Sequence, residues 1–198
     1  MTDWEANLSP IARERLARIG ELTGQEKEQM VDSRKIEDLL SEFYQDRIDP
    51  DGLWRRLKVE GKPSLLREAQ TRLIDSLSFG TTPAELQKRR DGILGIETLK
   101  DEPDIRALEE GLDLVDGLQR KYKSEIEQIY NSIKVEVERN PQLRVKQVQQ
   151  GQRMVLVQMT VDEAIRQLPQ WQDFLEQHER KYGNEFARVM ERLKRELR

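Results

Sequence analysis

Residues 105–133 read IRALEEGLDLVDGLQRKYKSEIEQIYNSI, and their inward positions recur at alternating steps of three and four. This heptad spacing is typical of a coiled coil, in which the apolar stripe of one helix packs against another helix. The stretch therefore predicts a long helix whose stripe is covered by one or more helices. The predicted contact positions are Ile105, Leu108, Leu112, Val115, Gln119, Tyr122, Ile126, Ile129 and Ile133.

The composition of the chain offers little apolar material to cover this stripe. Hydrophobic and charged residues each make up 36% of the chain, whereas ordinary domains have about 45–50% apolar and about 25% charged residues. The stripe is about 45 Å long at 1.5 Å per residue. We therefore expect a homodimer or higher oligomer, with another protein as the alternative partner. Gln119 fits this expectation, because a buried polar residue in a seam can fix the register and number of helices.

An intramolecular cover is the competing interpretation. Residues 82–85 read Thr-Pro-Ala-Glu, a capping box that predicts a helix from Pro83 to about Leu99. This helix is only about half as long as the stripe, and Arg89 interrupts its own apolar side. It would therefore cover only part of the stripe.

Capping signals predict further helices before and after the long one. Residues 23–26 and 160–163 carry two more capping boxes, and a Ser-Pro pair predicts a helix over residues 9–22. Near the C-terminus, an aromatic helix face extends from Trp171 to Gly183, where Asn184 is expected to cap a final helix. The N-terminal half of the chain is therefore expected to be helical, and the C-terminus to hold several shorter helices.

The period of the apolar residues changes after Ile133. Residues 133–137 alternate apolar and charged side chains, which suits a strand as well as a helix end, and Pro141 ends either one. We favour the helix. The segment nevertheless remains a candidate third strand for the hairpin that follows.

Residues 143–159 predict a β-hairpin, with strands over Leu143–Val148 and Met154–Met159 and with Gly151 in the turn. Both faces of the second strand are largely apolar, and no charge interrupts it. A lone two-stranded hairpin is only marginally stable in water. The second strand must therefore be covered by helices, joined by residues 133–137, or paired with another chain. The predicted contact residues here are Val155, Val157 and Met159.

Charge and cysteine content exclude several classes of protein. The formal net charge of −4 gives no general attraction for nucleic acid or for an anionic membrane. The absence of cysteine excludes disulfides and thiolate sites and fits a reducing cytoplasm. No segment approaches a run of about 18 apolar residues, and the N-terminus has no signal-peptide core. We expect a soluble cytoplasmic protein with no membrane contact.

The sequence predicts no catalytic residue, cofactor site or metal site. Residues 92–95 lack the additional glycine and the Lys-Ser/Thr pair of a phosphate-binding loop, and no Glu-x-x-His pair is present. His178 is the only histidine, which excludes zinc sites built from several imidazoles. It shares a helix face with Phe174 and Tyr182. We expect it to be a structural residue, with a catalytic base as the alternative.

Together these features predict a mainly α-helical fold with one long coiled-coil-type helix and a small antiparallel β-hairpin. Residues 1–100 are expected to form an N-terminal helical bundle or arm, and residues 101–198 the long helix, the hairpin and the C-terminal helices. The expected function is a non-enzymatic interaction or scaffold protein that assembles through the long helix and the hairpin edge. The alternative is a nucleic-acid-associated regulator that uses the basic clusters at residues 88–90 and 120–123. An enzyme with an unrecognised site comes third.

Overall fold

The computed structural model describes residues 23–150 and 153–197. The helix predicted over residues 9–22 and the turn predicted at Gly151 lie outside these residues. The chain divides into two compact units between Ile48 and Asp49.

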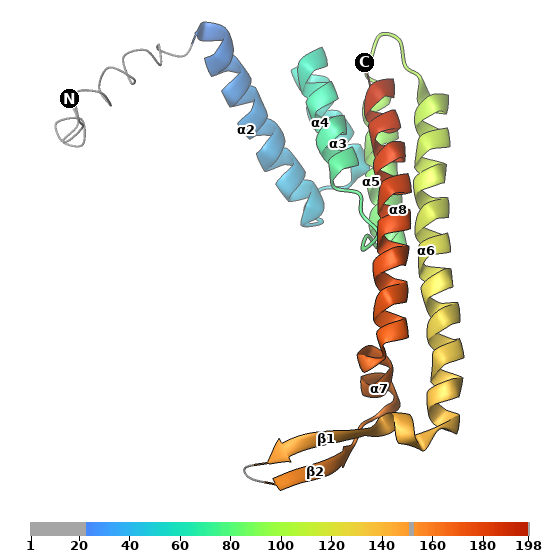
Figure 1. Cartoon of the computed structure of the whole chain (residues 1–198). Helices are drawn as coiled ribbons and strands as arrows, with labels where there is room; N and C mark the ends of the chain where they lie inside the picture. Colours follow the sequence, from blue (N-terminus) through green and yellow to red (C-terminus); the bar gives the residue numbers. More distant parts are fainter. Residues whose placement is uncertain (1–22, 151–152, 198) are drawn as a thin grey trace, which may run out of the picture. The chain divides into compact units, whose positions relative to one another are not determined.

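The fold is mainly α-helical with one long helix and a small antiparallel hairpin, which confirms the predicted fold class (Figure 1). The first unit contains α2 (Gly24–Tyr44). The second unit contains, in chain order, α3 (Pro50–Glu60), α4 (Pro63–Asp75), α5 (Pro83–Glu97), α6 (Ile105–Arg139), the 3₁₀ helix η2 (Pro141–Arg144), β1 (Val145–Gln150), β2 (Arg153–Gln158), α7 (Val161–Gln167) and α8 (Pro169–Glu196).

The three predicted capping boxes each begin a helix. At α2 the Thr23 hydroxyl accepts a hydrogen bond from the Glu26 N–H at 3.2 Å, and the Glu26 carboxylate accepts one from the Thr23 N–H at 2.7 Å. The same reciprocal pair begins α5 and α7. Each box satisfies donors that the first helical turn leaves without intrahelical partners, so the sequence fixes these helix starts locally.

Helices α3, α4 and α5 pack around a core of leucine and isoleucine side chains. Helix α5 also packs against α6, and α4 against α8, so packing crosses the boundary near residue 100 that the sequence suggested. Buried Glu97 accepts hydrogen bonds from Gln70 Nε2 at 2.7 Å, Lys100 Nζ at 2.8 Å and the Asp104 N–H at 3.0 Å. It thereby ties the end of α5 to the start of α6. The core includes Leu53, Leu57, Leu65, Leu73, Ile93 and Ile96.

Helices α6 and α8 lie side by side in antiparallel orientation (Figure 1). Near one end of the pair Gly111 faces Leu193, and a Cβ added at Gly111 would lie 2.4 Å from Leu193 Cδ2. In the middle Tyr122 stacks on His178, with ring centroids 4.8 Å apart. Near the other end Tyr130 meets Trp171 edge to face. These contacts extend along most of both helices.

Helix α8 is continuous from Pro169 to Glu196, so the predicted break at Gly183 and Asn184 is wrong. A glycine inside a helix costs about 1 kcal/mol relative to alanine. The burial of Tyr182 before it and Leu193 after it, both fully buried, outweighs that cost. The resulting helix of 28 residues is long enough to follow α6.

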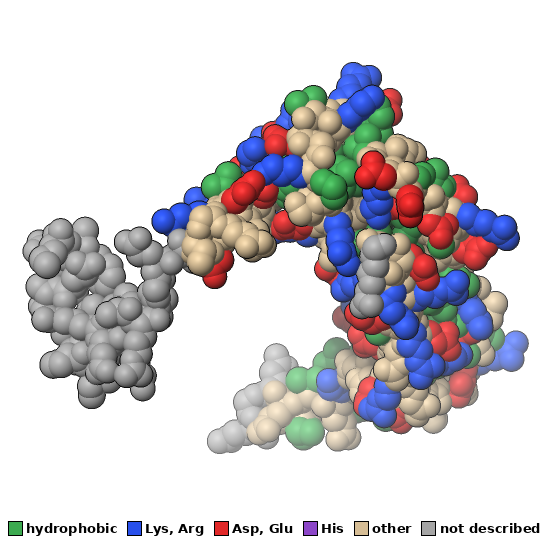
Figure 2. Space-filling model, turned by 90° about the horizontal axis from the view of Figure 1, so that it is seen from above, with side chains coloured by type: hydrophobic (Ala, Val, Ile, Leu, Met, Phe, Trp, Pro, Cys, Tyr) green, Lys and Arg blue, Asp and Glu red, His purple; other side chains and the backbone are tan. Residues whose placement is uncertain are grey.

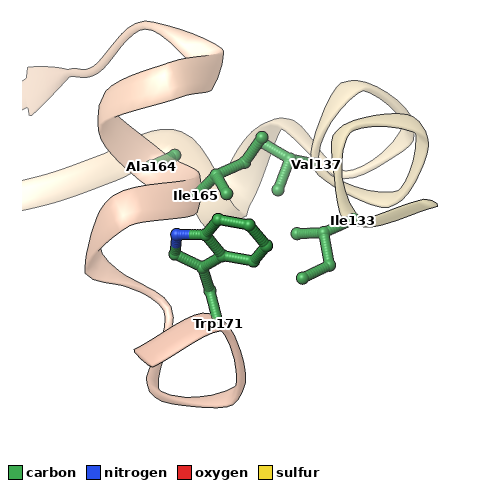
Figure 3. Packing of buried hydrophobic residues seen from close by; sticks show 5 residues of the cluster. All are labelled: Ile133, Val137, Ala164, Ile165 and Trp171. Carbon is green, nitrogen blue, oxygen red and sulfur yellow. The ribbon is translucent and has the colours of Figure 1, made fainter. Parts of the chain in front are cut away.

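Residues 133–137 are helical, as favoured from the sequence, and belong to the last turns of α6. Ile133 and Val137 pack there against Ala164 and Ile165 of α7 and Trp171 of α8 (Figure 3). The Tyr130 hydroxyl also donates a hydrogen bond to Asp162. This cluster joins the ends of three helices immediately beside the hairpin.

The hairpin follows η2 and leads into α7. Its two strands pair antiparallel from Val145 opposite Gln158 to Gln150 opposite Arg153. Leu143, expected within the first strand, lies instead in η2, where Pro141 fixes a helical start. Met159, expected within the second strand, lies just beyond β2, and its N–H donates to the Arg144 carbonyl at 2.7 Å.

Candidate functional site

The predicted contact stripe on α6 is covered over half of its positions by helices of the same chain. Five of the predicted positions are buried, namely Leu108, Leu112, Val115, Gln119 and Ile133. Tyr122 and Ile126 are half-buried, whereas Ile105 and Ile129 each remain 37% exposed. Helices α8 and α5 therefore cover most of the surface that was expected to bind a partner.

Gln119 fixes a contact within the chain. Its Nε2 donates a hydrogen bond to the Ser78 carbonyl in the connection between α4 and α5. Two further residues hold the same connection, since Arg89 Nη1 donates to the Ser76 carbonyl at 2.7 Å and Lys123 Nζ to the Thr81 carbonyl at 3.4 Å. The polar interruption of the stripe thus hydrogen-bonds to a loop carbonyl of the same chain and needs no second copy.

His178 is buried in the interface between α6 and α8. Its ring lies among those of Tyr122, Phe174 and Tyr182, with centroid distances of 4.8, 5.0 and 4.5 Å. Nε2 lies 3.2 Å from the Tyr122 carbonyl, and Nδ1 lies 3.5 Å from the Glu125 carboxylate. Both ring nitrogens therefore have partners inside the helix pair, which supports a structural role.

Tyr182 and Glu125, which both lie against His178, have shifted pKa values. Burial raises the pKa of the Tyr182 hydroxyl to about 12, and the neighbouring Glu125 carboxylate adds to this. The Tyr182 hydroxyl in turn lowers the pKa of Glu125, followed by Lys181 and His178. The hydroxyl approaches the carboxylate without reaching full hydrogen-bond geometry. Tyr182 therefore stays neutral beside an ionised Glu125 at neutral pH.

The hairpin is the least covered apolar region of the second unit. Every side chain of β2 is exposed, with Leu156 at 66% and Met154 at 63%. Val145 and Val148 on β1 are also exposed, at 44% and 41%. Figure 2 shows hydrophobic side chains on its surface, in the pale segment at the lower left of that view.

The register assigns these side chains to two faces, because residues opposite each other in a sheet share a face. One face carries Val145, Met154 and Leu156 between glutamines, and the other carries Val148, Val155 and Val157 between Lys146 and Arg153. Neither face is packed against a helix to the extent that would bury it. The hairpin contains two cations and no carboxylate.

The structure separates the three hairpin residues singled out from the sequence. Val155 and Val157 are exposed at 38% and 45% on the valine face. Met159 is half-buried and packs against the cluster of Figure 3, so it belongs to the base of the hairpin. Met154 and Leu156 were not among the predicted contact residues, although the uninterrupted apolar run around them was the available signal.

Within residues 23–150 and 153–197, no three His, Asp or Glu side chains are grouped so that they could hold a metal ion. No helix in these described ranges is long and apolar enough to cross a membrane.

The profile of a protein family described as a family of unknown function (DUF6657) matches residues 52–198 of the chain. The match spans helices α3 to α8 except for the first two residues of α3, and it includes the hairpin. Comparison with curated proteins and with solved structures gave no match.

Proposed function

The chain belongs to the DUF6657 family of unknown function, and we propose that it is a non-enzymatic interaction protein that assembles with a second copy of itself through its β-hairpin. The observation that carries the proposal is the hairpin with apolar residues exposed on both faces. A two-stranded hairpin is marginally stable alone, so an occupant that pairs with it or covers it stabilises it. The lack of cysteine in the whole chain fits a cytoplasmic location.

The base of the hairpin is held firmly, which suits a docking element. The cluster of Ile133, Val137, Ile165 and Trp171 fixes the ends of α6, α7 and α8 beside η2 and β2. The Met159–Arg144 hydrogen bond closes the base of the hairpin at 2.7 Å. A partner that binds the strands therefore meets an element whose attachment is already ordered, which reduces the entropy lost on binding.

The exposed apolar residues concentrate near this end of the second unit. Ile129 and Val135 on α6 and Leu143 in η2 are exposed at 37%, 45% and 37%, close in sequence to the hairpin. Contiguous exposed apolar surface commonly marks an interaction site. The seam further up α6 is covered within the chain, and this leaves the exposed hairpin end as the surface through which we propose that two copies meet.

A protein strand suits the hairpin better than a lipid surface. The described sheet has only two strands, so each strand has one edge without a strand partner. In hydrocarbon each unsatisfied backbone N–H or C=O group costs several kcal/mol, which disfavours insertion of an open hairpin. The paired residues nearest the turn, Gln150 and Arg153, are of polar and charged types as well.

Sedimentation velocity over a concentration series tests the proposal. The unmodified protein should shift from monomer to dimer as its concentration rises toward about 1 mM, where an association free energy of about 4 kcal/mol half-populates the complex. Leu156→Lys should stay monomeric, because it places a charge in the apolar centre of the hairpin. The matched control is Val59→Lys, since Val59 is 87% exposed on α3, far from the hairpin in sequence. A monomer at every concentration, or equal association of Leu156→Lys, would contradict the proposal.

A further inference from the structure

The open edges of the hairpin restrict what can occupy it. The outer edge of a two-stranded sheet presents backbone N–H and C=O groups that another strand can pair with. Side-chain packing alone would leave these groups to water. A strand that continues the sheet satisfies them and also extends both apolar faces. The occupant that satisfies the open backbone edge is therefore a β-strand.

The edge of β2 is more apolar than the edge of β1. The four central residues of β2, Met154 to Val157, are all apolar. The strand β1 reads Val-Lys-Gln-Val-Gln-Gln. Pairing at the β2 edge therefore places apolar side chains beside each other across the new strand pair, whereas pairing at the β1 edge brings glutamines together.

We propose, on the basis of the function proposed above, that two copies pair antiparallel through their β2 edges about a two-fold axis at Leu156, giving a four-stranded sheet. An axis perpendicular to the sheet keeps the same face of both hairpins on the same side. The valine face of one copy then continues into the valine face of the other. Leu156 lies opposite its own copy, Val155 opposite Val157, and Met154 opposite Gln158.

The charges of the hairpin are compatible with this arrangement. The two copies of Arg153 are six residues apart along the paired strands, or about 20 Å at 3.3 Å per residue. The two copies of Lys146 lie on the outer strands, three strand spacings apart and offset by two residues along the strands, or about 16 Å. Both separations exceed the Debye length of about 8 Å at physiological ionic strength. Like charges therefore do not oppose the pairing of two identical hairpins.

The size of the contact predicts that the dimer is reversible. The strands are only six residues long. Edge pairing therefore buries less accessible surface than a stable specific interface, which needs at least about 1,200 Å². The copies should exchange readily, and the fraction of protein in the dimer should rise with protein concentration. A covalent trap is therefore the direct test of the register.

Single-cysteine crosslinking provides this trap, because the chain has no cysteine of its own. Leu156→Cys places the two thiols on strands one spacing apart, about 5 Å. Gln147→Cys is the matched control, since Gln147 pairs directly with Leu156 and shares its face. The two Gln147 positions would be about 14 Å apart, whereas a disulfide requires Cα atoms within about 7 Å. Under a mild oxidant at high protein concentration, Leu156→Cys should crosslink at least about tenfold faster than Gln147→Cys.

A second measurement checks the register independently. Val155→Cys and Val157→Cys, mixed as proteins of different length, should form more of the mixed disulfide than of either homodimer, because these positions lie opposite each other. Circular dichroism of each variant verifies folding. Preferential crosslinking of Gln147→Cys would assign the contact to the β1 edge and overturn the inference. Equal rates for Leu156→Cys and Gln147→Cys would overturn it too.

Sedimentation of the unmodified protein distinguishes failure of this inference from failure of the proposed function. A concentration-dependent dimer without the Leu156 crosslink overturns only the edge-pairing inference. A strict monomer overturns both proposals. The occupant to be tested would then be a strand of another protein, and the two cations of the hairpin would favour an acidic one.

Discussion

The upper part of the α6–α8 pair and the β-hairpin both carry apolar stripes, but only the first is covered within the chain. Leu108, Leu112 and Val115 are buried at 1% exposure or less, whereas Met154 and Leu156 exceed 60%. The seam lies against a helix long enough to follow it. The hairpin projects from the helix ends (Figure 1), and no described helix of the second unit lies over its strands so as to bury them. An apolar pattern thus shows that a surface requires a partner, and the surrounding chain determines whether that partner is internal.

The largest effect should come from the covered stripe. Leu112→Ala removes a side chain that is 1% exposed and should lower the free energy of unfolding by about 2–5 kcal/mol. Urea denaturation at low protein concentration measures this change without a contribution from association. Leu114→Ala, on the same helix at 46% exposure, is the control and should change the unfolding free energy by no more than about 0.5 kcal/mol. Similar effects from both would remove the distinction between covered and uncovered residues.

Because α6 and α8 lie close together near Gly111, two glycine substitutions in α6 should change the free energy of unfolding in opposite directions. A Cβ at Gly111 would lie 2.4 Å from Leu193 Cδ2, whereas nothing lies within 4 Å of a Cβ at Gly117. Gly111→Ala should destabilise the protein by about 1–3 kcal/mol through overpacking. Gly117→Ala should stabilise it by up to about 1 kcal/mol through helix propensity. Thermal and urea unfolding of both variants would show the difference, and stabilisation by Gly111→Ala would mean that the two helices are not in close contact there.

The buried carboxylate beside the covered region predicts a dependence on pH. Burial raises the pKa of Glu97, but hydrogen bonds from Lys100, Gln70 and the Asp104 N–H lower it by more, so the net pKa falls below its usual 4.5. The unfolded chain then binds the proton more tightly, and stability is present above pH 4.5 and decreases as the pH falls through the lowered folded value.

Glu97→Gln tests that dependence. The free energy of unfolding of the variant should be about 1–3 kcal/mol lower at neutral pH, because a charge-assisted buried hydrogen-bond network is weakened. Its stability should also depend less on pH in the acid range. Exposed Glu102→Gln is the matched control, with little effect on either quantity. Urea unfolding between neutral and acidic pH measures both. An unchanged dependence on pH in the acid range for Glu97→Gln would assign the acid sensitivity to other carboxylates.

The smallest effect on the stability of the monomer should come from the hairpin. Leu156→Ala changes a side chain that is 66% exposed, so the unfolding free energy at low concentration should change by no more than about 0.5 kcal/mol. The same substitution should weaken association at high concentration, as measured by light scattering. A large loss of monomer stability would mean that Leu156 is covered within the chain, contrary to the comparison.

Local signals in the sequence predicted most of the helices. The boxes at residues 23–26, 82–85 and 160–163 begin α2, α5 and α7 because the capping hydrogen bonds involve neighbours three residues apart. The strands of the hairpin were predicted with end errors at Leu143 and Met159, whose placement depends on η2 and on packing against the helix ends.

The cover of the α6 stripe could not be predicted in the same way. The only internal cover weighed from the sequence was the helix from Pro83 to about Leu99, and the C-terminal helix that follows α6 in the structure was expected to break at Gly183. The continuity of α8 depends on long-range burial of Tyr182 and Leu193, which no local pattern reveals. The Ser78 carbonyl that accepts the hydrogen bond from Gln119 is 41 residues away in the chain, so the spacing of residues could not predict this contact either. For the hairpin the sequence left three outcomes open, namely cover by helices, pairing with residues 133–137, or pairing with another chain. Residues 133–137 are helical and every side chain of β2 is exposed, so the first two are not realised in the described residues.

Hydrogen exchange measured at low and high protein concentration tests the central claim most directly, because it compares the two regions in one experiment. We predict that amides within Arg153–Gln158 exchange more slowly at high concentration, as new strand hydrogen bonds form, while amides around Leu112 and Val115 exchange at the same slow rate throughout. Unchanged exchange in β2, or concentration-dependent protection of the α6 seam instead, would contradict assembly through the hairpin.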